Sequence, residues 1–303
     1  MAPPPRPPFG FRSLVFFLLL ASFGTIAWRG GFFPSLGESR RASSVMGSAK
    51  QGKLALGAAA STRRRSSALA PGTRDLEGEQ LAVQRYIRLG LPLFCGGGDR
   101  HYVALTFDDG PGPYTAKTLE ILDDAGARAS FFLVGRNLAW YPGRAELEAP
   151  NNAVGDHTWT HAYLTRLTFA DQQKEIEDTR RAIAEATLGQ VLLFRPPGGF
   201  HTPTIDQLIS ANGMLEVMWS VDSMDSAGAT TPQVLHNSVA GLKPGAIILM
   251  HENRGTTLQM LPRLLKEIAR LGLQTVTVPE LLRLDPPTAE QMQENAAARG
   301  CVS

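Results

Sequence analysis

The sequence predicts an α/β fold in which about seven parallel strands form a barrel or a partial barrel. Two observations lead to this prediction. From about residue 100 to residue 285, short apolar runs alternate with segments of helical periodicity, which is the pattern of repeated β/α units. Polar, reactive residues follow directly after five of these runs, and in such folds functional residues gather at the carboxyl ends of the strands.

The predicted strands are short apolar runs, as expected for strands that are buried on both faces of a parallel sheet. They span residues 102–107, 130–135, 153–156, 192–195, 215–221, 246–251 and 273–278.

The segments between these strands carry helix start and stop signals. One helix is predicted to begin with a capping-box-like pattern at Thr168 and to end near Gly189. A second begins at Thr231 and has a proline in its first turn. A third has Leu and Ile at helical spacing and stops at Gly272.

Residues 1–33 are predicted to be a secretory signal peptide or an uncleaved membrane anchor. Arg6 and Arg12 precede sixteen uncharged residues from Ser13 to Trp28, which is the order of a basic region and an apolar core in a signal sequence. The run is shorter than the ~20 residues of a comfortable membrane span. In both interpretations the rest of the chain is exported, so the protein is predicted to be extracytoplasmic, either secreted or held at the membrane by this segment.

Residues 34–80 are predicted to be a disordered linker that is rich in Ser, Ala, Gly and Arg. The folded domain is predicted to span residues 81–285, followed by a C-terminal tail at residues 286–303. Residues 1–80 have a net charge of +7, whereas residues 81–303 have a net charge of −5. A nucleic-acid-binding protein usually has a basic folded domain, so this distribution argues against nucleic acid as a partner.

Cys95 and Cys301 are the two cysteines of the chain, and they lie near the two ends of its folded part. Two cysteines exclude a disulfide-rich scaffold and a cysteine-based metal site. Because exported proteins with two cysteines often pair them, we favour a disulfide between them over two unrelated thiols.

Five segments at the predicted strand ends contain residues suited to catalysis. They are Asp108-Asp109-Gly110-Pro111, residues 156–161, residues 195–199, Asp222-Ser223-Met224-Asp225 and His251-Glu252-Asn253. Scattered surface charges would not fall so regularly at the ends of apolar runs. We therefore expect these side chains to share one rim of the barrel.

His157 and His161 are candidate metal ligands, because a spacing of four would place both imidazoles on one side of a helical turn. Asp108 or Asp109 can supply a third ligand from the end of the first strand. Two histidines and one carboxylate leave an open position for water, as in catalytic zinc sites, where the pKa of the bound water falls to ~7. The other aspartate is then free to accept a proton from that water.

Arg195 and His251 also lie at the ends of buried runs. An unpaired charge is costly there, so a carboxylate of the aspartate pair is the expected partner of Arg195. His251 is suited to donate a proton to a leaving amine. Asp222 or Asp225 would hold it in the donating tautomer.

These five segments, in this order, resemble the motifs of the polysaccharide deacetylase family, which is also called the NodB-homology domain or carbohydrate esterase family 4. The resemblance covers roughly residues 100–285, and its first two motifs are the most specific. The matching segments are Thr106-Phe107-Asp108-Asp109-Gly110-Pro111, His157-Thr158-Trp159-Thr160-His161, Arg195-Pro196-Pro197, Asp222-Ser223-Met224-Asp225 and Leu249-Met250-His251.

The resemblance implies that residues 81–285 are a catalytic domain with a distorted β/α barrel. It implies a divalent metal held by Asp109, His157 and His161. Zinc is the expected ion, with Co²⁺ or Mn²⁺ as alternatives. The implied reaction is hydrolysis of an N-acetyl group on an amino sugar, which gives acetate and a free amine.

The resemblance also implies roles for the remaining polar residues of the rim. Asp108 would be the general base and His251 the general acid. Arg195 would position Asp108, and Asp225 would tune His251.

Two positions depart from the family pattern. Gly198 stands where the third motif commonly has an aromatic residue, although its backbone N–H, which helps to bind the oxyanion in the family, is retained. Ser226 stands where a Trp usually follows the fourth motif, so one wall of the groove is smaller or is built elsewhere. Trp219 and Leu249 are candidates for lining an acetyl-sized pocket, and Asp222 is a further candidate for substrate contact.

The leading hypothesis is an exported, metal-dependent hydrolase that removes N-acetyl groups from a cell-wall glycan, such as peptidoglycan or chitin-like oligomers. One alternative is hydrolysis of a small non-sugar amide by the same metal site. Another is a catalytically silent glycan-binding module, against which the complete set of ligands and acid–base residues argues. His101, His201 and His236 are expected to have no catalytic role, with His201 placed close enough to the third motif to contact substrate.

Overall fold

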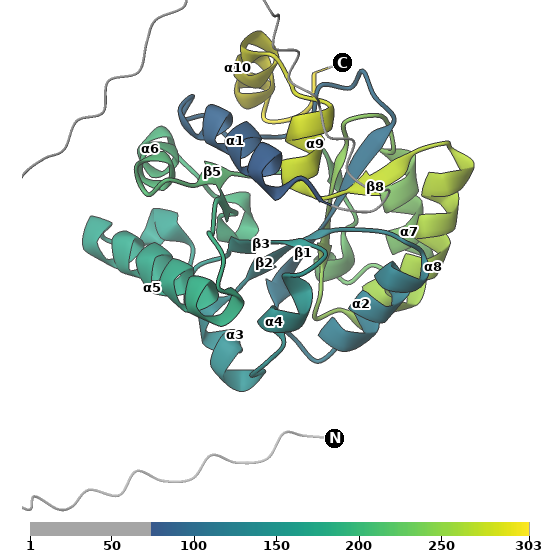
Figure 1. Cartoon of the computed structure of the whole chain (residues 1–303), viewed down its shortest axis with the longest axis horizontal. Helices are drawn as coiled ribbons and strands as arrows, with labels where there is room; N and C mark the ends of the chain where they lie inside the picture. Colours follow the sequence, from purple (N-terminus) through teal and green to yellow (C-terminus); the bar gives the residue numbers. More distant parts are fainter. Residues whose placement is uncertain (1–73, 303) are drawn as a thin grey trace, which may run out of the picture. The chain divides into compact units, whose positions relative to one another are not determined.

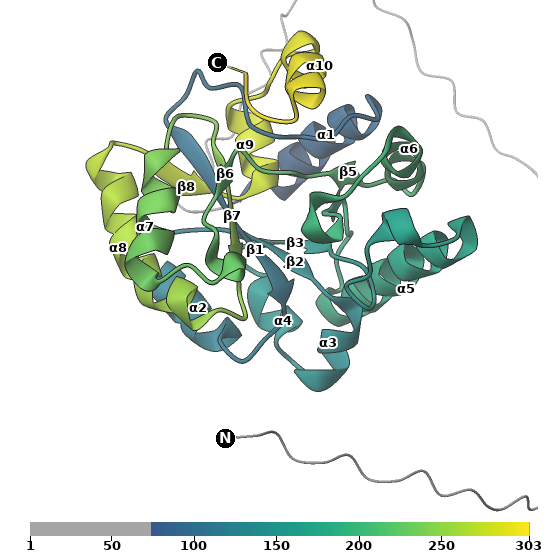
Figure 2. The ribbon, with the colours of Figure 1, turned by 180° about the vertical axis from the view of Figure 1, so that it is seen from behind.

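The structure, a computed structural model, describes residues 74–302 (Figures 1 and 2). The predicted signal peptide or anchor and the predicted linker up to residue 73 lie outside the described residues. Among residues 74–302, no helix combines the length and the apolar composition that crossing a bilayer requires.

The centre of the fold is a curled sheet of parallel strands, which confirms the predicted incomplete barrel (Figure 1). Seven strands follow in the order β5-β4-β3-β2-β1-β7-β6, and β8 pairs with the first residues of β1. The strands are β1 (Tyr102–Gly110), β2 (Ser130–Leu133), β3 (Ala153–Asp156), β4 (Leu193–Phe194), β5 (Leu215–Glu216), β6 (Val221–Asp222), β7 (Ile247–His251) and β8 (Gln274–Val276).

A short extended segment connects the two sides of the curled sheet. Leu93 pairs with Val217, directly after β5, and Cys95 pairs with Ala246, directly before β7. The Leu93 N–H donates to the Glu216 carbonyl, and the Met218 N–H donates to the Leu93 carbonyl. These bonds satisfy backbone groups that an open sheet edge would leave exposed.

The prediction of one strand over residues 215–221 is wrong, because β5 and β6 lie at opposite ends of the strand order. The residues between them leave the sheet, and their backbone groups find other partners. The Val217 and Met218 carbonyls accept hydrogen bonds from the Arg195 side chain. The Ser220 N–H donates to the Ile247 carbonyl. An apolar run cannot reveal this change of partners, because all of its buried positions look alike.

Helices surround the sheet (Figures 1 and 2). They are α1 (Leu76–Ile87), α2 (Thr115–Asp124), α3 (Gly135–Trp140), α4 (Ala145–Glu148), α5 (Phe169–Thr187), α6 (Pro203–Ala211), α7 (Thr231–Ala240), α8 (Gly255–Arg270), α9 (Val278–Leu284) and α10 (Ala289–Ala298). The Thr168 side chain caps α5 as predicted, but the left-handed residue at its end is Leu188 rather than Gly189. Helix α8 ends before Gly272, whose φ of +71° suits glycine.

Two apolar clusters lie on the two faces of the sheet. Phe107 and Phe131 stack in one cluster with ring centroids 5.2 Å apart, whereas Ala104 and Phe132 belong to the other. Successive residues of a strand point to opposite faces, so the continuous apolar runs of β1 and β2 supply both clusters. The sheet thus forms a rigid frame for the polar side chains that follow its strands.

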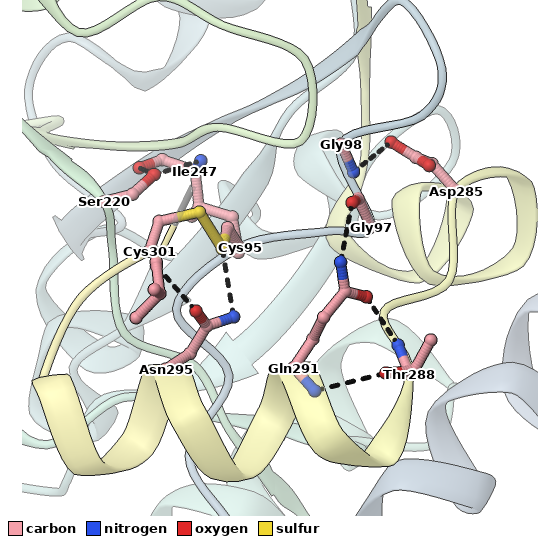
Figure 3. Close-up of a disulfide and its surroundings, with 11 residues drawn as sticks. Cys95, Gly97, Gly98, Ser220, Ile247, Asp285, Thr288, Gln291, Asn295 and Cys301 are labelled. Carbon is pink, nitrogen blue, oxygen red and sulfur yellow. Dashed lines mark hydrogen bonds between the residues drawn. A yellow bond between two sulfur atoms is a disulfide. The ribbon is translucent and has the colours of Figure 1, made fainter.

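The ends of the described chain pack together beside α9 (Figure 1). Helix α1 begins at Leu76, inside the segment predicted as linker, because the Asp75 side chain caps it. The predicted tail contains α10. Cys95 and Cys301 form the favoured disulfide, with Cα atoms 5.9 Å apart, and Asn295 of α10 donates to the Cys95 sulfur (Figure 3). The disulfide fixes the segment after α10 to the barrel.

Candidate active site and metal centre

The structure brings the polar residues of five separate segments to the carboxyl ends of the strands, as the sequence predicted. Asp108 and His251 are direct partners in the pairing of β1 with β7. His157 follows β3 and Arg195 follows β4, while Asp225 lies three residues after β6. One rim of the sheet therefore holds two carboxylates, two imidazoles and a guanidinium within reach of one another.

Asp109, His157 and His161 form a cluster whose nitrogen and oxygen atoms could hold a metal ion. Asp109 Oδ1 lies 3.2 Å from His161 Nε2 and 3.8 Å from His157 Nε2. Two ligands at ~2.0–2.2 Å from one tetrahedral zinc ion are about 3.4 Å apart. The side chains present therefore fit a divalent cation without a change of backbone.

The ring orientation of His157 is set by the next strand. Its Nδ1 lies 2.7 Å from the Arg195 carbonyl, which can only accept, so Nδ1 carries the proton of the neutral ring. The unprotonated Nε2 then faces Asp109. Histidine ligands of metals are commonly held in this way, with the remote nitrogen bound to a carbonyl or carboxylate.

The electrostatics of the cluster favour the forms that bind metal. Burial raises the pKa of Asp109, but the imidazoles of His157, His251 and His161 outweigh burial and hold that pKa below its usual range. Burial, followed by the charge of His157, lowers the pKa of His161. Near neutral pH the carboxylate is therefore ionised and the His161 imidazole is neutral.

The two histidines do not lie on a helical turn, so that part of the prediction is wrong. Thr158 and His161 have φ values of 64° and 62°, and the chain forms an irregular loop. The Asp156 side chain accepts the Thr158 N–H at 2.8 Å and closes the first turn. Glu175 of α5 accepts both the N–H and the hydroxyl of Thr160. These contacts bring the two rings together, with centroids 5.0 Å apart.

Asp108 is paired with Arg195 rather than with the metal cluster. One of its oxygens accepts from Arg195 Nη1 at 2.7 Å, while the other lies 3.6 Å from His157 Nε2. Arg195 is completely buried and also donates to Thr106 Oγ1 and to the carbonyls of Val217 and Met218. The Cζ atom of Arg195 lies over the Phe132 ring, 4.2 Å from the ring centroid. The free oxygen of Asp108 thus faces the metal cluster from a fixed position.

Of the two candidate carboxylates, Asp225 rather than Asp222 contacts His251. His251 Nδ1 lies 2.7 Å from Asp225 Oδ1, and the His251 N–H donates to Asp225 Oδ2. The Thr257 hydroxyl of α8 donates to the same carboxylate. Asp222 instead accepts the Met224 N–H within its own loop.

The pKa values of this pair move in opposite directions. Burial lowers the pKa of His251, but the hydrogen bond to Asp225 and the charge of Asp108 outweigh it, so the pKa is raised from its ordinary value. Burial raises the pKa of Asp225, yet the hydrogen bond and charge of His251 hold it below its usual range. His251 is therefore suited to carry a proton at neutral pH.

The predicted substrate-contacting residues lie around the same rim. Gly198 has a φ of +67°, and a Cβ atom there would meet Phe200 at 2.9 Å and Tyr163 at 3.3 Å. The space beside Gly198, where the family commonly has an aromatic side chain, is thus occupied by the rings of Tyr163 and Phe200. These two rings pack edge to face with their centroids 5.0 Å apart. Trp219 contacts the chain at Gly199.

Leu249 is buried on β7 beside Asp222, its partner on β6. A cavity of ≈ 270 Å³ opens beside Asp109 and His161. It is lined by residues that include Asn137, Trp140, Tyr141 and Asn253.

Sequence reasoning assigned no role to several residues that support this rim. Asn253 donates to Asp109 Oδ2 at 3.1 Å and orients the carboxylate. Beneath the loop after β1, burial raises the pKa of Glu252 to about 8 and raises that of the adjacent Glu148 as well. Glu252 also accepts from the Thr115 hydroxyl. The only sequence signal for Asn253 and Glu252 was their position directly after His251.

Comparison with known proteins identifies relatives over this domain. A family model described as polysaccharide deacetylase matches residues 96–217. A peptidoglycan-N-acetylglucosamine deacetylase of Bacillus cereus is 32% identical over 60% of this chain and 88% of that protein. A peptidoglycan-N-acetylmuramic acid deacetylase of Bacillus subtilis is 32% identical over 59% of this chain, but only 38% of that longer protein is covered. A chitooligosaccharide deacetylase of a Bradyrhizobium species is 31% identical over 59% of this chain and 90% of that protein.

Solved structures of similar proteins share the fold. A family 4 carbohydrate esterase from Streptomyces lividans, in complex with acetate, is 35% identical with a TM-score of 0.57 over 62% of this chain and 99% of that one. A family 4 pseudoenzyme from Bacillus anthracis is 28% identical with a TM-score of 0.61 over 65% of this chain and 70% of that one.

Fold, site and relatives together define a hydrolase that cleaves carbon–nitrogen bonds. The chain belongs to the polysaccharide deacetylase family, which confirms the resemblance seen in its five motifs.

Proposed function

We propose that this protein is an exported, divalent-metal-dependent enzyme that removes N-acetyl groups from the amino sugars of a cell-wall glycan. The observation that carries the proposal is the cluster of Asp109, His157 and His161, with the free oxygen of Asp108 on one side of it. Relatives that deacetylate peptidoglycan and chitooligosaccharides support the choice of a glycan.

Asp109, His157 and His161 would hold the cation. When bound, it supplies a Lewis acid for the acetamide carbonyl and an acidified water molecule at neutral pH. Asp108 accepts the proton of the attacking water through its free oxygen, as a general base. Arg195 keeps that oxygen aimed at the site, because its guanidinium binds the other oxygen of the same carboxylate.

His251 donates the proton that the leaving amine requires. Asp225 accepts a hydrogen bond from the Nδ1–H of His251, so the proton on Nε2 is the one available for transfer to the amine. The backbone N–H of Gly198 is available to stabilise the oxyanion. Trp219 and Leu249 form apolar walls for the acetyl methyl group, and Asp222 is proposed to contact the sugar.

Export is supported by the disulfide between Cys95 and Cys301, because disulfides persist in oxidising compartments. The basic and apolar residues of the predicted signal peptide or anchor agree with it.

A catalytically silent glycan-binding protein is the second candidate, because a pseudoenzyme shares this fold. Such a protein needs no acid–base residues. The Asp108–Arg195 and His251–Asp225 pairs therefore favour an enzyme here.

We expect the purified full chain to release acetate from peptidoglycan and from N-acetylglucosamine oligomers. Xylan and a small acetamide serve as the comparison substrates, and acetate is measured by an enzyme-coupled assay. If only the small acetamide released acetate, the substrate would be a non-sugar amide and not a glycan. No release from any substrate, with the metal cluster loaded, would favour the binding protein.

Asp225→Asn is expected to move the alkaline limb of the kcat–pH profile to lower pH. The wild-type carboxylate raises the pKa of His251, and the protonated imidazole is the active form, so its loss makes His251 deprotonate at lower pH. At neutral pH kcat should fall by about 10–100-fold. An unchanged alkaline limb would show that Asp225 does not raise the pKa of His251 during catalysis.

A further inference from the structure

A second cluster of metal-ligating side chains lies at the β5 edge of the sheet and shares no residue with the active-site cluster. His201 follows the turn Pro197–Gly199, Asp206 is on α6, and Glu216 is on β5. Their ligand atoms lie within 4.8 Å of one another. Three separate elements therefore direct one imidazole and two carboxylates to a single point.

The distances match those of the active-site cluster. His201 Nδ1 lies 2.9 Å from Asp206 Oδ1 and 3.5 Å from Glu216 Oε1. The corresponding distances from Asp109 Oδ1 are 3.2 Å and 3.8 Å. Both sets bracket the separation of about 3.4 Å expected for two ligands of one tetrahedral ion.

Glu216 provides an independent indication of a ligand. Its side chain is 2% exposed, and neither of its oxygens accepts a hydrogen bond within the described residues. The Glu216 carboxylate nevertheless lies beside that of Asp206. Within residues 74–302, the ion pairs of both carboxylates are with His201, and neither is paired with Lys or Arg. Two neighbouring carboxylates out of water are costly unless a cation or a shared proton accompanies them, and here His201 offers a third ligand for a cation.

We propose that His201, Asp206 and Glu216 bind a second divalent cation. One imidazole and two carboxylates suit Zn²⁺ or Mn²⁺, with water completing the coordination. The proposal does not depend on the deacetylation reaction, because none of the three residues belongs to the catalytic rim.

The cation would fix the loop that carries the third motif. His201 is two residues after Gly199, which packs against Trp219, and this loop leads back to Arg195. Asp206 and Glu216 would attach the end of the loop to α6 and β5 at the same time. The second cation would therefore be structural, holding the proposed oxyanion-binding backbone on the sheet.

The test is zinc binding to the full chain after removal of metal by a chelator. Titration calorimetry should give about two equivalents for the wild type and about one for His157→Ala/His161→Ala, whose active-site cluster is destroyed. Adding Glu216→Gln to that double variant should abolish the remaining equivalent. Glu216→Gln preserves the size of the side chain, and circular dichroism checks that the variants are folded.

A stability measurement covers the case in which calorimetry is ambiguous. Zinc at a hundredfold excess over Kd should raise the Tm of His157→Ala/His161→Ala by about 5–10 °C. The shift should vanish when His201→Gln is added and should remain when His236→Gln is added as the matched control. If the double variant binds neither Zn²⁺ nor Mn²⁺, or if its bound metal is unaffected by Glu216→Gln and His201→Gln, the second site does not exist. None of these experiments measures enzymatic activity, so their outcome tests the second metal site independently of the proposed reaction.

Discussion

Replacing Asp109 with alanine is expected to remove the active-site cation and acetate release together. Asp109 Oδ1 lies within 4 Å of the Nε2 atoms of both His157 and His161, and the other oxygen of Asp109 is held by Asn253. Without it, two neutral imidazoles would have to hold a doubly charged ion alone. We expect metal content to fall by about one equivalent per chain and kcat/KM to fall by more than about 10³-fold.

Two further variants serve as comparisons for the loss of metal and activity expected in Asp109→Ala. Asn253→Ala keeps all three proposed ligands and removes only the donor that orients Asp109, so metal affinity should fall by about 10–100-fold. Asp123→Ala, on the exposed side of α2, should leave both metal content and rate unchanged. If Asp109→Ala kept its full metal content and its rate, the assignment of this ligand would be wrong.

Asp108→Asn is expected to show the opposite combination, with metal retained and turnover lost. The amide can still accept a hydrogen bond from Arg195, but it cannot take a proton from water. Loss of a general base corresponds to a fall of about 10²–10⁴-fold in kcat.

The same substitution has a predicted cost in stability. Arg195 is fully buried, and Asp108 is the carboxylate with which it forms an ion pair within the described residues. Breaking a buried ion pair on one side destabilises by about 3–5 kcal/mol. Chemical denaturation and metal analysis should therefore accompany the kinetics. A variant that is folded, loaded with metal and fully active would remove Asp108 from the role of base.

The positions of the proposed catalytic residues could be predicted because they follow from parallel strands. Asp108, His157 and His251 each come directly after or at the end of an apolar run, and parallel strands end on the same side of a sheet. The local sequence left the choice between Asp222 and Asp225 open, and only the resemblance to the family implied Asp225. Both lie in one loop, and Thr257, which helps to bind Asp225, comes from a helix far along the chain.

The features that sequence reasoning missed depend on contacts between distant residues. The interruption between β5 and β6 exists because the Arg195 side chain and the backbone of Leu93 bind backbone groups that a continuous strand would pair. His201 is separated from Glu216 by a whole helix. No local periodicity indicates either association, since periodicity reports only which face of an element is buried.

The most direct test of the account is acetate release by the full chain before and after removal of metal. A chelator should abolish acetate release from peptidoglycan, and Zn²⁺ should restore it to the wild-type chain but not to His157→Ala/His161→Ala. The wild-type chain recovers because its cluster binds the cation again, whereas the variant has lost both imidazoles. Undiminished acetate release from the metal-free wild-type chain would contradict the proposal that Asp109, His157 and His161 hold the cation on which the reaction depends.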